Sequence, residues 1–299
     1  MNRQLTLLGL DIEGEWNVPL LQNAAAMCRA SLRFAHTNSP SDVPKRGSVP
    51  HLDRLIGQFD HVIACEATRH SRPVYDYPCP RGHVAVIVGN ELTGIPKPVL
   101  KSVEQVISIP MYGRGMSSIN VAAAAAIVLY TISRDLARKR LRRSSLAQPD
   151  IDVLVVGPRD PSELGSLLRS VWAFGWKRVF LDDCNGVWFT KDRPTVLAGR
   201  AAARREGNPL AVLPCAQLDL HDYDAIVACG DGKRGAPLSR WSPPKAGRLL
   251  LVYGESELPS PFAADEVVYV DHPAAEVEAA FRHAGSILLS VVSQLCTRR

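Results

Sequence analysis

The sequence predicts an α/β fold built on a largely parallel sheet, and it predicts this fold twice in one chain. Two observations lead to this prediction. Short apolar strands alternate with helical or loop segments along the whole length, and blocks of the first half recur in the same order in the second half. A length of 299 residues fits two domains of ordinary size.

In the first half, apolar runs predict strands at 5–10, 61–64, 84–88 and 106–109. A long apolar and small-residue segment then predicts a helix over about 119–141, which Ser117 or Ser118 could cap. The stretch RRSSLAQPD (142–150) is polar and contains proline, as expected for an interdomain linker. We therefore expect one domain at 1–143 and another at 151–299.

In the second half, strands are predicted at 153–156, 178–181, 225–228, 249–252 and 266–270. FDHVIAC (59–65) matches YDAIVAC (223–229), and VAVIVGNEL (84–92) matches LLLVYGESEL (249–258). NAAAMCRASLRF (23–34) matches ELGSLLRSVWAF (163–174), which pairs Arg29 with Arg169 at an offset of 140 residues. Three blocks in one order predict a duplicated domain.

The composition excludes several classes of protein. The longest strongly apolar stretch, 121–132, is too short for the roughly 20 residues that cross a bilayer. Asp11 and Glu13 interrupt the first apolar run, so no signal peptide is expected. Seven cysteines without a C-x-x-C pair favour a reducing compartment. These features predict a cytoplasmic protein.

The net charge of +5 is a mild bias towards polyanions. Six basic residues crowd the segment 134–143, namely Arg134, Arg138, Lys139, Arg140, Arg142 and Arg143. A solvated helix end, where cations suit the helix dipole, and a phosphate-contacting surface are equally good interpretations of this segment.

Chemistry-bearing residues gather where strands are expected to end. Gly89 follows one strand, and Glu91 stands two residues further on. The next strand ends at Ile109-Pro110-Met111, and Ser118 and Asn120 then lie near a helix start. Because ligands of open α/β sheets bind at the carboxyl ends of strands, these loops predict a binding site.

Other known sequence motifs lack residues that their chemistry requires. Gly89-x4-Gly94 has the spacing of a P-loop, but Ile95-Pro96 replaces the Lys-Ser/Thr pair that phosphates and metal need. Gly254-Glu-Ser-Glu-Leu258 lacks the second glycine of a nucleophile elbow. No G-x-G-x-x-G follows a strand, and the histidines and cysteines lack metal-ligand spacing.

The first half resembles the SpoU/TrmH branch of the SPOUT (α/β-knot) RNA methyltransferases. Asn23-x5-Arg29 with Phe34 resembles its first motif, and G-N-E-L-T-G (89–94) its second. I-P-M…S-x-N (109–120) resembles the third. A register with Asn17 as the motif-one asparagine is set aside, because the Asn23 register also aligns Phe34 and agrees with the second half.

The resemblance implies a trefoil knot at the carboxyl side of the sheet, an exception to the rule against threaded chains. S-adenosylmethionine would bind there, contacted by Cys65, Gly89, Ile109, Met111 and Ser118. The reaction implied is methyl transfer to a ribose 2′-hydroxyl of tRNA or rRNA, and it requires no metal because the methyl donor is already activated.

The resemblance also assigns roles to residues. Arg29 would stabilise the developing alkoxide, with Asn23 and Glu91 orienting it, while Ser118 and Asn120 position cofactor and ribose. Simpler interpretations stay open. Arg29 could only pair with Glu91, and Ser118 could only cap a helix. Asn120 is harder to explain by capping, since it is expected inside the helix.

The second half departs from the family. Glu163 replaces the motif-one asparagine, motif two reads G-E-S-E-L-P (254–259), and S-x-N is absent. We therefore expect an internal pseudodimer with one cofactor site, and RNA contacts from Arg169, Arg138 and Arg142. Two rival hypotheses are a non-catalytic RNA-binding or assembly factor, and an enzyme that methylates a base or a protein.

Overall fold

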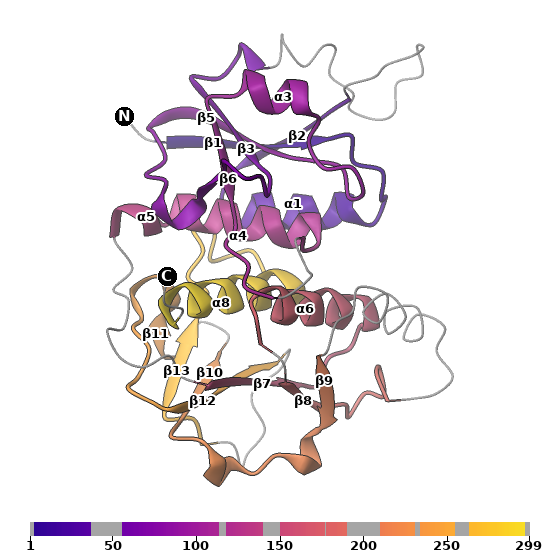
Figure 1. The fold of residues 1–299 in the computed structure, drawn as a ribbon, viewed down its shortest axis with the longest axis vertical. Helices are drawn as coiled ribbons and strands as arrows, with labels where there is room; N and C mark the ends of the chain where they lie inside the picture. The colour runs from indigo at the N-terminus through magenta and orange to yellow at the C-terminus, as the bar shows by residue number, and fades with distance from the viewer. Residues whose placement is uncertain are drawn as a thin grey trace. The chain divides into compact units, whose positions relative to one another are not determined.

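The computed structural model describes residues 3–36, 56–113, 118–139, 150–176, 178–189, 210–230, 234–254 and 263–296. The chain forms two compact units, each assembled from three segments (Figure 1). Unit 1 consists of Met1–Pro110, Asn120–Arg140 and His272–His283, and unit 2 of Met111–Ile119, Leu141–Asp271 and Ala284–Arg299.

Unit 1 is built on a parallel sheet with the strand order β2-β1-β5-β3-β6-β4. Its strands are β1 (Arg3–Leu10), β2 (Ser31–Ala35), β3 (His61–Cys65), β4 (Arg72–Pro73), β5 (Gly82–Val88) and β6 (Gln105–Ser108). All four strands predicted in the first half are confirmed. The strands β2 and β4 were missed, because β2 buries only Ala35 and β4 has two residues, so neither leaves an apolar run.

Helices cover both faces of this sheet. The helices α1 (Asn17–Met27) and α4 (Val121–Ser133) lie on one side, and α3 (Lys97–Ser102) lies on the other (Figure 1). Under α3 the core includes Leu10, Ile87 and Val99. A short turn η1 (Val74–Asp76) and the helix α5 (Leu136–Lys139) complete the described part of the unit.

The helix predicted at 119–141 is shorter than expected. It begins after Asn120 and ends at Ser133, because Asp135 takes a positive φ of 51° that stops the helix before α5. Ser118 does not cap it. The Asn120 side chain does so instead, and the prediction that Asn120 lies inside the helix is wrong.

Unit 2 repeats the sheet with the order β11-β13-β10-β12-β7-β8-β9. Its strands are β7 (Asp150–Val156), β8 (Arg178–Asp182), β9 (Ala211–Pro214), β10 (Ala225–Cys229), β11 (Ala236–Pro237), β12 (Arg248–Gly254) and β13 (Glu266–Tyr269). All pairings are parallel, and the five predicted strands are confirmed. Read from its other end, the order equals that of unit 1 with β9 added at one edge.

The helices of unit 2 are α6 (Pro161–Ala173) and α8 (Phe281–Cys296), and both lie on the same side of the sheet (Figure 1). Three short turns, η2 (Cys215–Gln217), η3 (Leu220–Asp222) and η4 (Leu238–Arg240), connect its strands. Sheet residues such as Leu154, Phe180 and Leu250 form its core.

The two halves align at an offset of 146 residues around their first helices, not 140. Arg29 and Gly175 each follow the helix in the left-handed region, with φ of 52° and 94°. The amide of Arg29 donates to Ala26 O, and that of Gly175 to Trp172 O, so these positions correspond. Asn17 thus corresponds to Glu163, and Asn23 to Arg169, which corrects the sequence alignment of this block.

Each unit includes a loop segment from the other half of the chain. In unit 1 the segment His272–His283 lies against α1, where Ala274 N donates to Met27 O at 3.0 Å. In unit 2 the segment Met111–Ile119 lies against α6, where Tyr112 N donates to Ala173 O at 2.9 Å. Met27 and Ala173 occupy equivalent helix positions, so the exchange of segments is reciprocal.

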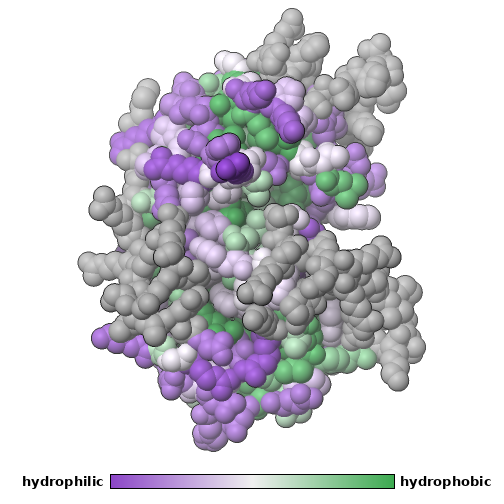
Figure 2. All heavy atoms as spheres, in the orientation of Figure 1, coloured by the Kyte–Doolittle hydropathy of each residue, from purple (hydrophilic) through white to green (hydrophobic). Residues whose placement is uncertain are grey.

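The described surface mixes hydrophilic side chains with smaller hydrophobic areas (Figure 2). The helices of the described ranges include none that is long and apolar enough to span a membrane. All seven cysteines are free thiols.

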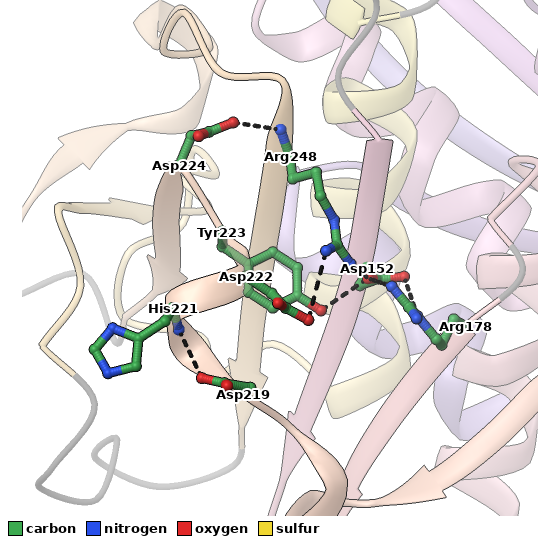
Figure 3. A network of polar contacts seen from close by, with 8 residues as sticks. All are labelled: Asp152, Arg178, Asp219, His221, Asp222, Tyr223, Asp224 and Arg248. Carbon is green, nitrogen blue, oxygen red and sulfur yellow. Dashed lines mark hydrogen bonds and ion pairs between the residues drawn. The ribbon is translucent and has the colours of Figure 1, made fainter.

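A buried carboxylate ties the amino ends of three strands of unit 2 together (Figure 3). Asp152 on β7 accepts two hydrogen bonds from Arg178 on β8, at 2.9 and 2.5 Å, and one from the Tyr223 hydroxyl at 2.8 Å. Arg248 on β12 approaches the same carboxylate at 3.5 Å. Burial and then the bond to Asp152 raise the pKa of Tyr223, so this hydroxyl keeps its proton. Ligands of such sheets bind at the carboxyl ends of the strands, whereas this cluster lies at their amino ends. We therefore interpret the cluster as structural.

Replacing this carboxylate is expected to destabilise unit 2. Asp152→Asn should lower the free energy of unfolding by about 2–3 kcal/mol, because it removes the charge that pairs with Arg178 while the site stays buried. Urea unfolding monitored by circular dichroism measures the change. Asp222→Asn is the control, since Asp222 is exposed and approaches Arg248 only at 3.5 Å, and it should change stability by less than about 0.5 kcal/mol. Equal effects of the two substitutions would contradict the interpretation.

Candidate functional site

The carboxylate of Glu91, in the loop after β5, links two loops of unit 1. Its Oε1 accepts hydrogen bonds from Asn17 Nδ2 at 2.6 Å and from the Gly14 amide at 3.1 Å. Its Oε2 accepts from the Glu13 amide at 3.3 Å. Glu91 therefore fixes the loop after β1 against the loop after β5, at the carboxyl edge of the sheet.

These donors keep Glu91 ionised. Burial by itself would raise the pKa of Glu91, but several hydrogen bonds outweigh burial and hold it below its usual value. The donors are its own backbone, the Asn17 amide and the backbone amides of Glu13 and Gly14. The site thus presents a fixed negative charge near neutral pH.

Asn17 connects Glu91 to the start of α4. Its side chain is buried, with a relative exposure of 2%, and its Oδ1 accepts from Asn120 Nδ2 at 3.2 Å. The Asn120 Oδ1 in turn accepts from the amides of Ala122 and Ala123 at 3.0 and 3.3 Å, which is the geometry of a helix N-cap. Three side chains far apart in sequence thus form one hydrogen-bonded set, Glu91–Asn17–Asn120.

The turn that carries Glu91 is held rigidly. Asn90 Oδ1 accepts from the amides of Leu92 and Thr93 at 2.8 and 3.0 Å, and Asn90 Nδ2 donates to Asp11 O at 2.7 Å. A Cβ on Gly89 would lie 2.5 Å from the Gly94 carbonyl carbon, so the chain can close this turn only with glycine at position 89.

Three of the residues predicted to contact a cofactor follow neighbouring strands. Cys65 ends β3, Gly89 follows β5 and Ile109 follows β6, and β3 pairs with both β5 and β6. Burial and then the charge of Glu66 raise the pKa of the Cys65 thiol to about 12, so it stays neutral. At these three positions the edge offers backbone groups and uncharged side chains to a ligand. Of the other two predicted contacts, Met111 and Ser118 belong to unit 2.

Asn23 does not join the Glu91 set. Its Nδ2 donates to Glu278 O at 2.8 Å, and its Oδ1 accepts from the Ala280 amide and lies 2.9 Å from His283 Nδ1. Burial, and then nearby Arg282, lower the pKa of His283 to about 3, so its ring is neutral. All of these bonds attach the segment His272–His283 to α1.

Arg29 also lies apart from Glu91. Its side chain is 65% exposed, and its Nη2 approaches Glu276 Oε1 at 3.3 Å. An exposed pair of this kind contributes little stability. Of the predicted catalytic residues, the structure therefore joins Glu91 and Asn120 through Asn17, and does not bring Asn23 or Arg29 to them.

In unit 2, Arg169 contacts the predicted motif-three serine. Its Nε donates to Ser118 O at 3.1 Å, and its Nη2 donates to Ser118 Oγ at 2.5 Å. Met111 packs in the same unit against Trp172 and Ala173. Arg169 occupies the position of Asn23 on the equivalent helix, and both donate to a loop carbonyl, Ser118 O or Glu278 O.

Two predicted RNA contacts cannot be placed. Arg142 lies outside the described residues, as does the side chain of Arg138. Within the described ranges, no group of three or more histidine, cysteine or acidic side chains has the arrangement of a metal site.

The sequence matches the model of the SpoU rRNA Methylase family over residues 22–130. This match covers the segment that contains the three sequence motifs, and it agrees with the resemblance to the SpoU/TrmH family that those motifs show.

Two curated relatives share short segments with the chain. A tRNA (guanosine(18)-2′-O)-methyltransferase of Aquifex aeolicus is 35% identical over 71 residues, which are 23% of this chain and 33% of that protein. An uncharacterized tRNA/rRNA methyltransferase of Archaeoglobus fulgidus is 44% identical over 50 residues, which are 17% of this chain and 22% of that protein. The chain thus spans a third or less of the curated relatives it matches.

Solved structures that match this chain include the TrmH/SpoU tRNA modifying enzyme of Aquifex aeolicus, with 22% identity and a TM-score of 0.38 over 46% of this chain and 79% of that one. The SpoU methyltransferase AviRb of Streptomyces viridochromogenes, in complex with AdoMet, has 19% identity and a TM-score of 0.37. It covers 47% of this chain and 59% of that one.

Asn17 is the site residue that sequence reasoning set aside. The alternative register of motif one contained it, but the comparison of the two halves at an offset of 140 argued against it. The end of α1 would have corrected this choice, since the left-handed residue after the helix aligns Arg29 with Gly175.

Removing the charge of Glu91 is expected to weaken unit 1 near neutral pH. Glu91→Gln should lower the free energy of unfolding by about 1 kcal/mol, because an amide oxygen accepts less strongly from three donors than a carboxylate does. The folded-state pKa of Glu91 lies below its ordinary value of 4.5, so the charge contributes fully above that value. Its contribution is lost as the pH falls through the folded-state pKa.

Unfolding curves of both proteins across the acid range measure this difference. The gap between wild type and Glu91→Gln should be constant near neutral pH and close under acid conditions. Glu15→Gln, at an exposed carboxylate of the neighbouring loop, is the control and should follow the wild type throughout. A gap that widens towards acid pH would show that Glu91 is not held ionised.

Proposed function

We propose that this protein is an S-adenosylmethionine-dependent RNA methyltransferase that methylates a ribose 2′-hydroxyl of tRNA or rRNA. The observation that carries the proposal is the Glu91–Asn17–Asn120 set, which joins motif two to motif three in a domain of the SpoU/TrmH family. Two curated relatives are named as methyltransferases of tRNA or of tRNA/rRNA, which agrees with the proposal. We also propose the trefoil knot of the family for this domain, and a cytoplasmic location.

The residues at the carboxyl edge fit the cofactor. Backbone groups beside Cys65, Gly89 and Ile109 come from three adjacent strands, and their side chains carry no charge that would repel a sulfonium ion. Met111 and Ser118 lie in the chain segment that follows β6 and leads to α4. S-adenosylmethionine supplies a methyl group on a positively charged sulfur, which keeps the bonding electron pair when the methyl group leaves. No metal is required.

We assign the arginine of the reaction to Arg169. Its guanidinium donates to Ser118, and Ser118 is separated from Asn120 by one residue of the chain. A guanidinium is a positively charged donor, so Arg169 would stabilise the alkoxide that forms as the ribose hydroxyl loses its proton and attacks the methyl group. The hydroxyl proton passes to a phosphate oxygen of the RNA or to water.

The two halves, 1–143 and 151–299, would then be copies of one domain that form an internal pseudodimer. The common strand order and the reciprocal segments support this. At the positions of Asn17, Ser118 and Asn120 the other half has Glu163, Glu278 and Ala280, which cannot form the same hydrogen-bonded set. The second copy would serve as support and, with the basic segment 134–143, as an RNA-contacting surface.

One cofactor site per chain is therefore expected. Isothermal titration with S-adenosylhomocysteine should give a stoichiometry of one, and Asn120→Ala should weaken this binding because it removes the cap of α4 and the bond to Asn17. Glu278→Ala, at the position of the second half that is equivalent to Ser118, is the control and should leave this binding unchanged. Two equivalent sites would contradict the assignment.

Two arginine variants test the catalytic assignment. Arg169→Ala should lower kcat for methyl transfer to RNA by about 100-fold or more, with S-adenosylhomocysteine affinity nearly unchanged, because the alkoxide loses its charged donor. Arg169→Lys should recover little, since an ammonium cannot donate as a planar fork. Arg29→Ala should behave as wild type. The sequence-based assignment to Arg29 predicts the reverse result.

The substrate is identified by nucleoside mass spectrometry of tRNA and rRNA from the native host with and without the protein. Loss of one 2′-O-methylated nucleoside is the expected result. Loss of a base-methylated nucleoside would overturn the ribose target, and no change in any nucleoside would favour an RNA-binding or assembly factor that has lost turnover.

A further inference from the structure

Trp16 is a large hydrophobic side chain that the fold leaves in water. It is 75% exposed, whereas Trp172, Trp188 and Trp241 are all buried. An exposed single aliphatic residue is ordinary, but an exposed indole next to a polar site requires a reason.

Helix capping does not explain the exposed tryptophan. Trp16 occupies the N-cap position of α1 and makes no side-chain hydrogen bond to the helix. Serine, threonine, aspartate or asparagine at this position would stabilise the helix, and tryptophan does not. Packing in the core does not explain the tryptophan either, because most of its side chain contacts solvent.

The indole stands beside the Glu91 set. A Cβ placed on Gly14 would lie 3.1 Å from Trp16 Nε1, 3.0 Å from Glu91 Oε1 and 2.8 Å from Asn17 Nδ2. The three groups therefore surround one glycine, and any larger residue there would displace them. Trp16 also directly precedes Asn17 in the chain.

Leu92 is a second exposed hydrophobic residue on the neighbouring loop. It is 88% exposed and directly follows Glu91. Its backbone is fixed, because the Leu92 amide donates to Asn90 Oδ1 at 2.8 Å. Two fixed loops thus each present an apolar side chain next to a member of the same polar set.

We propose that Trp16, with Leu92, forms a stacking surface for an unpaired nucleobase of the RNA substrate, next to the ribose that is methylated. This inference rests on the proposed function and adds the class of substrate to it. Bases within a duplex have both faces covered by their neighbours, so only a base in a loop or single strand can stack on an indole. The enzyme would therefore select unpaired nucleotides.

Tryptophan fluorescence of the full-length protein tests this directly. Titration with a short single-stranded oligoadenylate should quench the wild-type emission, and the same strand paired with oligouridylate should quench it far less. Trp16→Phe should bind nearly as well as wild type but without that quenching. Trp16→Ala should bind about tenfold more weakly, since stacking on an aromatic ring is lost.

Two results would overturn the inference. One is unchanged quenching in Trp16→Phe, and the other is wild-type affinity of a folded Trp16→Ala, with folding checked by circular dichroism. Methyl transfer by the wild type to total host RNA is measured separately. Loss of transfer alone would contradict the proposed function, whereas normal transfer with no contribution from Trp16 would contradict only this inference.

Discussion

The candidate site depends on one charged hydrogen-bonded group, the Glu91 carboxylate. A parallel sheet brings the carboxyl ends of its strands to one edge, but it does not fix the loops that follow them. Glu91 does this by accepting from Glu13, Gly14 and Asn17, and Asn17 extends the link to the cap of α4 at Asn120. The loops after β1 and β5 and the start of α4 thus keep one arrangement.

The two halves show how equal topology can carry different chemistry. One helix position holds Asn23 in unit 1 and Arg169 in unit 2, and each donates to a carbonyl of the segment that lies against its helix. Asn23 uses its whole amide for this attachment, whereas the Arg169 guanidinium also reaches the Ser118 hydroxyl. A long cationic side chain has donors beyond those that packing needs, and a short neutral amide does not.

Much of the fold could be predicted because its signals are local. Nine strands are short apolar runs, and the recurrence of blocks shows two similar sheets before any contact is known. The edge strand β2 was not predicted, because it buries only one residue and so leaves no apolar run. The early end of α4 was not predicted either, because the residue with the positive φ that stops the helix is Asp135 and not a glycine. Such features depend on packing around the chain rather than on periodicity.

The sequence by itself determined the α/β class, the nine strands, the family motifs and the presence of Glu91 and Asn120 in them. The tertiary structure decided which of two asparagines joins Glu91 and Asn120 in one hydrogen-bonded set. Asn17 and Asn23 differ by six residues on one helix, and only the Asn23 register places an arginine, Arg29, at the arginine position of motif one. In the structure, however, Asn17 faces Glu91 and Asn120, while Asn23 and Arg29 face the segment His272–His283. The sheet against which a helix packs sets the direction that each position of the helix faces. That direction in turn determines which side chains can form hydrogen bonds with one another.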